Sequence, residues 1–139
     1  MARKVKTKKE FMNEPLKKLV RIFSRNKHIT AVYVFGSYAK KKNTPLSDID
    51  VCVFTDSIKI TEKMRSDIIS HGSDELDINI FSELPITVQI RVFNEGIPLF
   101  VRDEEFVNHI QAETISRFLD FKPVLHTYYK KALGMEYEI

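Results

Sequence analysis

Alternating and β-branched apolar residues predict four strands along the chain. Three of them are expected at residues 29–35 (ITAVYVF), 48–54 (DIDVCVF) and 76–81 (LDINIF), where Val, Ile and Phe predominate. Residues 98–103 (PLFVRD) form a fourth, shorter strand at an edge of the sheet. The strands are few and short, so the sheet they predict is small.

Apolar residues at helical spacing predict helices before, between and after these strands. The first helix covers about residues 13–27 and begins at Asn13, whose side chain can cap it. A second covers residues 61–71. The last helix is long, begins at Asp103 and is expected to be kinked or interrupted at Pro123. Its inward-facing residues are expected to be Phe106, Ile110, Phe118 and Leu119.

Residues 86–93 (ITVQIRVF) fit the period of a strand and also that of a helix. We expect a helix, because Pro85 precedes the segment and Gly96 follows it, as at helix boundaries. A short helix is also expected after Gly36. Strands that alternate with helices predict an α/β (α+β) fold, in which helices pack on a small mixed β-sheet.

The composition is typical of one soluble globular domain, with 139 residues of which 43% are hydrophobic and 29% charged. No apolar run is long enough to span a bilayer, and the N-terminus lacks the apolar core of a secretory signal. Cys52 is the only cysteine, which excludes an internal disulfide and favours a reducing compartment. We therefore expect a cytoplasmic protein with no membrane partner.

Positive charge is concentrated at the N-terminus, where residues 1–10 (MARKVKTKKE) carry five basic side chains. Without those five, the net charge of +3 becomes −2. The rest of the chain is therefore not a basic platform, and a nucleic-acid partner is not expected. We interpret residues 1–10 as a disordered basic tail and residues 11–139 as a single domain that includes the C-terminal helices.

Aspartates interrupt the apolar pattern of the second strand. Asp48 and Asp50 flank Ile49 and, as alternate residues of a strand, project from the same face. If the third strand pairs beside the second, Asp77 adds a carboxylate about 5 Å away across the ladder. Three carboxylates so close repel one another, and a divalent cation would relieve this repulsion. Mg²⁺ prefers oxygen ligands, so the cluster points to metal-assisted phosphoryl chemistry.

A Gly-Ser turn supplies the complementary half of such a site. Gly36 follows the first strand and opens a short helix, where backbone N–H groups can face an anion. Ser37 adds a hydroxyl donor, and Lys40 brings positive charge near a triphosphate. A phosphate cradle beside acidic metal ligands is the arrangement that phosphoryl transfer requires.

The elements GSYA, SDIDVCVF and LDINIF resemble the DNA polymerase β-like nucleotidyltransferase superfamily. The short chain is similar to its minimal members, the MNT-type antitoxins that pair with HEPN toxins, and RVFNEGIPLFVRD and FLDFKP fit their second half. The resemblance implies a polymerase β-like fold, ATP or another nucleoside triphosphate as substrate, and Mg²⁺ as cofactor. It also implies that Asp48, Asp50 and Asp77 are catalytic and bind the metal, and that Asp77 helps to activate the attacking hydroxyl.

The resemblance also implies how the nucleotide is held. Lys40-Lys41 stand where minimal members commonly carry Arg-Gly. Lysine keeps the charge but lacks the planar fork of arginine, so it holds the triphosphate less rigidly. The nucleotide-binding residues implied are Gly36, Ser37, Lys40 and Ser47.

The function implied is transfer of AMP from ATP onto a HEPN ribonuclease, which silences that toxin. Other nucleotidyltransferases usually carry a second domain for the acceptor, and a chain of this length is expected to have no room for one. Two other functions remain open: an antitoxin that neutralises its partner by binding alone, and a small-molecule nucleotidyltransferase that works as a dimer. The nucleotide base, the acceptor atom and the oligomeric state, homomeric or heteromeric, are left open by the sequence.

Overall fold

The four expected strands are present and form one mixed sheet in the order β3-β2-β1-β4. The computed structural model describes residues 13–39, 48–56 and 59–134, apart from the side chains of Ser37 and Tyr38. Strand β1 is antiparallel to β2 and to β4, whereas β2 and β3 are parallel. The fourth strand lies at an edge, as expected. The strands are β1 (Ile29–Phe35), β2 (Ile49–Thr55), β3 (Leu76–Ile80) and β4 (Ile97–Val101).

The helices begin where the sequence places capping residues. The Asn13 side chain accepts a hydrogen bond from the Leu16 N–H at 3.0 Å, and the Asp103 side chain accepts one from the Phe106 N–H at 3.0 Å; each satisfies a donor that the helix leaves free. The ambiguous segment after Pro85 is a helix, as expected. The helices are α2 (Glu14–Ser24), α3 (Gly36–Ala39), α4 (Glu62–Ile69), α5 (Ile86–Glu95) and α6 (Glu104–Leu133).

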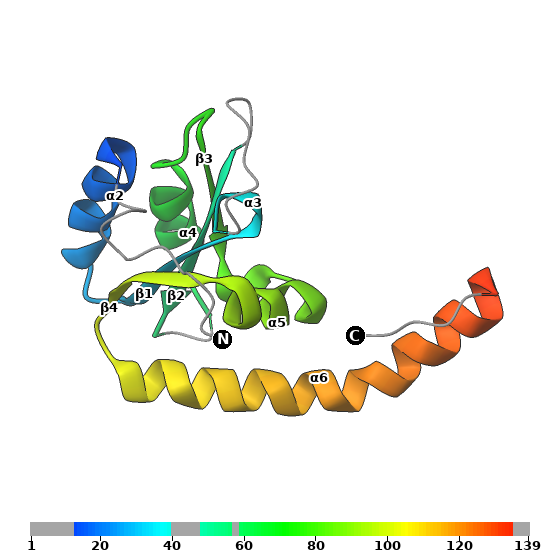
Figure 1. The fold of residues 1–139 in the computed structure, drawn as a ribbon. Helices are drawn as coiled ribbons and strands as arrows, with labels where there is room; N and C mark the ends of the chain where they lie inside the picture. The colour runs from blue at the N-terminus through cyan, green and yellow to red at the C-terminus, as the bar shows by residue number, and fades with distance from the viewer. Residues whose placement is uncertain (1–12, 40–47, 57–58, 135–139) are drawn as a thin grey trace, which may run out of the picture.

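Helices cover both faces of the sheet (Figure 1). On one face, Val32 of β1 and Val51 of β2 are fully buried against α2 and α4, which contribute Leu16 and Ile68. On the other face, the buried residues of the sheet pack against α5 and α6. Because side chains alternate along a strand, β2 directs Ile49, Val51 and Val53 to the first face and Asp50, Cys52 and Phe54 to the second.

Two expectations are wrong in detail, and a third is right in part. The third strand ends at Ile80, and Phe81 begins a short 3-10 helix, η1 (Phe81–Glu83), which turns its ring into the core on the α5 side. Leu119 is not inside the protein: 58% of its surface is exposed. Pro123 does not interrupt α6, which continues through it for 30 residues in all. A bend is visible in the orange part of that helix, where Pro123 lies (Figure 1).

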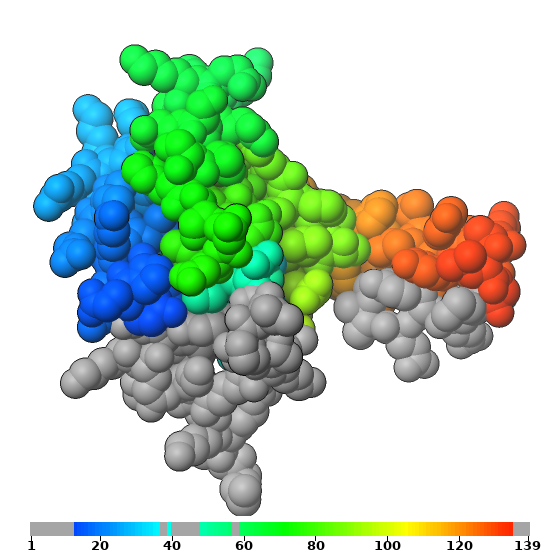
Figure 2. All heavy atoms as spheres, turned by 90° about the horizontal axis from the view of Figure 1, so that it is seen from above, coloured from blue at the N-terminus to red at the C-terminus, as the bar shows by residue number. Residues whose placement is uncertain are grey.

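Helix α6 is longer than the sheet that it covers. Thirty residues of α-helix span about 45 Å. In its first half, Val107 packs with buried residues of the sheet, and Phe118 is also buried. Its second half extends away from the sheet and the other helices (Figures 1 and 2). Among the residues that the structure describes, no helix has the length and apolar character needed to cross a membrane.

Candidate active site

Asp50 and Asp77 face each other across neighbouring strands. They are direct partners in the parallel ladder of β2 and β3, where strands lie about 4.8 Å apart, and their carboxyl groups share a hydrogen bond. Asp50 is half-buried and Asp77 is exposed. The sequence-based expectation that the third strand brings Asp77 beside the second strand is therefore confirmed.

Asp48 adds a third negative charge at the same end of the sheet. It lies just before β2 and is exposed. The pKa of Asp50 is raised above its ordinary value of 3.8, first by burial, then by the charge of Asp77 and their shared hydrogen bond, and then by the charge of Asp48. The carboxylates therefore repel one another.

Gly36 connects the Gly-Ser turn directly to these acids. The preceding residue, Phe35, pairs with Asp50 between strands β1 and β2. Gly36 itself has a φ of 74°, in the left-handed region that only glycine adopts at little cost. A Cβ at this position would overlap the carboxylate of Asp50. Glycine is required here for two reasons, the backbone conformation and the close approach of a catalytic candidate.

Arg91 is a neighbour of the acids that sequence reasoning missed. It lies on α5, and its positive charge acts against the other effects by lowering the pKa of Asp50. Its Nε atom is 3.6 Å from a carboxylate oxygen of Glu95, one helical turn away. No basic residue occurs within the acidic strands, and only the packing of α5 against the sheet brings this one near. Within the sequence of α5, nothing about Arg91 indicates that its side chain will lie near the acids.

Several of the expected nucleotide-binding residues cannot be placed. Ser37 lies in α3, directly after Gly36, but only its backbone is described. Lys40 and Ser47 lie outside the described residues. The part of the site that the structure describes therefore consists of the acids, the glycine turn and Arg91.

The donors at this end of the sheet suit a hard divalent cation. Two facing carboxyl groups offer oxygen ligands, and the pKa of Asp50 is raised first by burial and then by the neighbouring Asp77 and Asp48. Within residues 13–39, 48–56 and 59–134, however, no group of three or more His, Cys, Asp or Glu side chains is arranged to hold a metal ion. Asp50 and Asp77 meet, whereas binding by all three aspartates stays a prediction.

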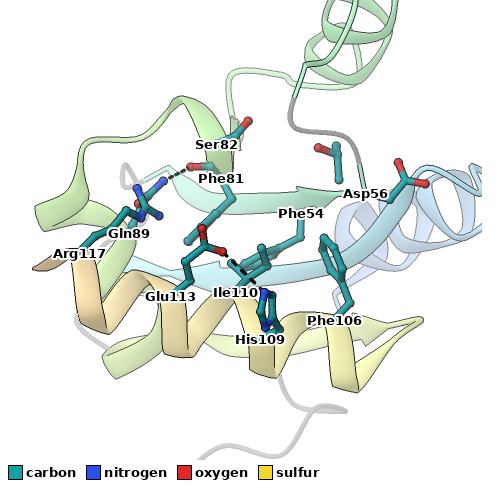
Figure 3. A pocket seen from close by; sticks show the side chains of 11 residues that line it. Phe54, Asp56, Phe81, Ser82, Gln89, Phe106, His109, Ile110, Glu113 and Arg117 are labelled. Carbon is teal, nitrogen blue, oxygen red and sulfur yellow. Dashed lines mark hydrogen bonds and ion pairs between the residues drawn. The ribbon is translucent and has the colours of Figure 1, made fainter.

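A pocket of about 570 Å³ lies elsewhere, at the opposite end of the same sheet face (Figure 3). Its floor contains the stacked rings of Phe54 and Phe81, 4.4 Å apart. Gln89 donates a hydrogen bond to the Phe81 carbonyl at 2.9 Å and accepts one from Arg117 of α6 at 3.2 Å. Asp50 and Phe54 are four residues apart on β2, about 13 Å, so this pocket is separate from the acids.

Two acids on adjacent strands beside a glycine turn are an arrangement suited to phosphoryl transfer. Comparison with known protein families shows to which family the chain belongs. The model of the family Polymerase beta, Nucleotidyltransferase, matches residues 17–105. This stretch contains the whole sheet, the Gly-Ser turn and all three aspartates. The chain therefore belongs to the polymerase β nucleotidyltransferase family, as the sequence resemblance implied.

The chain is also similar in sequence to a curated protein. The chain is 27% identical over 81 residues to "Putative protein adenylyltransferase MJ1547" of Methanocaldococcus jannaschii, a match that covers 58% of this chain and 63% of that protein. It therefore spans somewhat less than two thirds of this curated relative.

Solved structures show the same fold over nearly the whole chain. A chain of a toxin–antitoxin structure with AMP-PNP superposes with a TM-score of 0.70 at 19% identity, over 88% of this chain and 99% of the other. A chain from the complex of tri-AMPylated Shewanella oneidensis HEPN toxin with MNT antitoxin superposes with a TM-score of 0.64 at 17% identity, over 91% and 99%. At these identities the likeness is one of fold.

Proposed function

We propose that this protein transfers AMP from ATP onto a partner protein, a HEPN-type toxin, in a Mg²⁺-dependent reaction, and so acts as its antitoxin. The observation that carries the proposal is the hydrogen-bonded pair of Asp50 and Asp77 beside the Gly36 turn in a member of a nucleotidyltransferase family. The resemblance to a named protein adenylyltransferase and the fold shared with toxin–antitoxin chains support the choice of acceptor.

The chemistry requires one proton acceptor and one binding site for phosphates. A hydroxyl oxygen of the acceptor attacks the α-phosphorus of ATP, the bond from that phosphorus to the bridging oxygen breaks, and pyrophosphate leaves with the electron pair. Asp77 is the more exposed of the paired acids, so it can meet an incoming hydroxyl and take its proton. Asp50 is less exposed and adjoins Gly36, so it faces the nucleotide side.

The metal would be held by Asp50 and Asp77, with Asp48 as the third acid. A bound Mg²⁺ supplies positive charge that stabilises the phosphoryl oxygens in the transition state. Gly36, Ser37, Lys40 and Ser47 are the proposed nucleotide contacts.

The test replaces Asp77 and measures transfer and binding separately. Asp77→Asn keeps the shape of the side chain but removes its basicity, so AMP transfer onto a HEPN-type toxin supplied in the assay should fall at least ~10²-fold. Mass spectrometry of that protein measures the added AMP, and its ribonuclease activity is followed in parallel. Asp74→Asn is the matched control, because Asp74 is an exposed aspartate in the turn before the same strand.

Each alternative function gives a different result. Binding of the partner by Asp77→Asn without modification, and with the toxin still active, is the result expected of an enzyme. Neutralisation of the toxin by Asp77→Asn with no added mass would contradict the proposal and establish an antitoxin that acts by binding alone. Transfer of AMP onto a small molecule, with no transfer onto the protein, would contradict the proposal and show that the acceptor is a small molecule.

A further inference from the structure

The second half of α6 carries an unusual concentration of exposed apolar side chains. Among the described residues, every large apolar side chain classed as exposed lies between residues 115 and 133. Val124, Tyr128 and Leu119 each expose more than half of their surface, at 62%, 59% and 58%. Single exposed apolar residues are ordinary, but a cluster on one element marks an interaction surface. We call residues 115–133 the α6 extension.

The extension continues the stripe with which α6 covers the sheet. Val107, Thr114 and Phe118 are buried, and steps of three and four residues from Phe118 lead to Phe121, Leu125 and Tyr128 on the same helical face. Phe121 and Tyr128 are exposed, in the part of the helix that projects beyond the other described elements (Figure 2). The helix thus presents a surface suited to packing at a place where the described residues provide little to pack against it.

Charge argues against a second copy of this chain as the occupant. From residue 117 to residue 133 the chain has four basic side chains, Arg117, Lys122, Lys130 and Lys131, and one acidic side chain, Asp120. All five are exposed. Two such helices side by side would bring like charges together, which is unfavourable. The complementary surface is apolar with an acidic rim.

The direction of the extension fits an acceptor of AMP. In Figure 1 it runs out on the side of the sheet where α3 and α5 lie, and α3 begins at Gly36, which adjoins Asp50. A protein resting on the extension would lie in the angle between α6 and the sheet and face the glycine turn. We propose that the α6 extension docks the acceptor protein through an apolar helical surface with an acidic rim on that protein. This inference rests on the proposed function for the identity of the acceptor.

The test introduces negative charge into the apolar face. Val124→Glu with Tyr128→Glu alters two highly exposed side chains, so the fold should survive. The probe is the HEPN-type toxin used in the transfer assay, immobilised for biolayer interferometry. We expect its Kd to rise at least ~100-fold, because truncating or charging central apolar contacts removes most of the binding energy. Asn108→Glu with Ala112→Glu is the matched control: both residues are exposed on the same helix, they have the same spacing, and the Kd should stay within about threefold.

The outcomes separate the docking surface from the enzymatic function. Docking stands if the Val124→Glu, Tyr128→Glu variant loses binding, even where the wild-type chain binds the HEPN-type protein without modifying it. Docking is overturned if that variant binds as the wild type does, or if the wild-type chain does not bind the probe at all. It is also overturned if ultracentrifugation shows a wild-type homodimer that the variant breaks, or if the variant loses binding of RNA and keeps binding of the protein. Leu119→Glu replaces the double variant if circular dichroism shows that the latter is unfolded.

Discussion

The two ends of strand β2 differ sharply although they share one face of the sheet. At one end Asp50 meets Asp77 and the backbone of Gly36, and its pKa is raised by burial and by neighbouring negative charge. At the other end Phe54 is 1% exposed and lies against the rings of Phe81 and Phe93, with centroids 4.4 Å and 5.6 Å away. Between the two ends, Val51 and Val53 of the same strand are buried on the opposite face of the sheet.

The difference shows where stability and reactivity lie on this sheet. The aromatic end buries apolar surface and anchors α5 to the sheet, which stabilises the fold. The acidic end brings like charges together around a half-buried carboxyl group, which costs free energy and is kept where a ligand repays it. It also places a glycine in the left-handed region, which other residues adopt only with strain. Replacing residues at either end should therefore change different observables.

The largest effect is expected at the aromatic end. Phe54→Ala removes a fully buried ring that lies against three others, those of Tyr33, Phe81 and Phe93, so the free energy of unfolding should fall by ~3–5 kcal/mol, measured by guanidinium denaturation. Val124→Ala, at a side chain that is 62% exposed, should change it by less than about 0.5 kcal/mol. A loss below about 1 kcal/mol for Phe54→Ala would mean that this cluster does not anchor the sheet.

A smaller effect, with a different readout, is expected at the glycine turn. Gly36→Ala must either strain the backbone or displace Asp50, so it should cost ~1–2 kcal/mol of stability and remove the rise in melting temperature that we expect from ATP with Mg²⁺. Gly134→Ala is the matched control, since Gly134 also has a positive φ, 62°, but nothing lies within 4 Å of an added Cβ. If Gly36→Ala retained the full nucleotide-induced shift, the turn would not be part of the nucleotide site.

The smallest effect concerns the repulsion at Asp50. Its folded pKa is raised above 3.8, so the folded state binds this proton more tightly than the unfolded state, and stability falls as pH rises through that window. At pH 7, without metal, Asp50→Asn should therefore raise the melting temperature, by roughly 2 °C. This gain should shrink as the pH is lowered toward 3.8, as differential scanning calorimetry would show. If the gain in melting temperature stayed constant with pH, it would come from packing and not from the removal of charge.

Much of the fold could be predicted because local signals and packing agree. Strands β1 and β2 are rich in β-branched and aromatic residues, and α2 and α6 begin at the capping residues Asn13 and Asp103. Phe81 and Leu119 were wrong for different reasons: the apolar pattern of the third strand was extended to Phe81, and helical spacing assigned the apolar Leu119 to the core. Phe81 instead leaves the strand in a turn, and Leu119 lies beyond the sheet that would have covered it.

The candidate site was predicted less completely than the fold. Period-2 alternation placed Asp48 and Asp50 on one face, and pairing of the third strand brought in Asp77. The contact of Gly36 with Asp50 and the approach of Arg91 depend on how α3 and α5 pack on the sheet. Such contacts join segments far apart in the sequence, so no local pattern encodes them.

Cys52 lies between the two ends of β2 and is fully buried. Burial also raises the pKa of its thiol well above the ordinary value, so little reactive thiolate forms at neutral pH. A maleimide reagent should therefore leave the folded native chain unlabelled. New cysteines at exposed positions, such as Lys63 on α4 and Lys131 on α6, would then be the only sites to accept spin labels, and the distance between them would report the orientation of α6 with and without a bound partner.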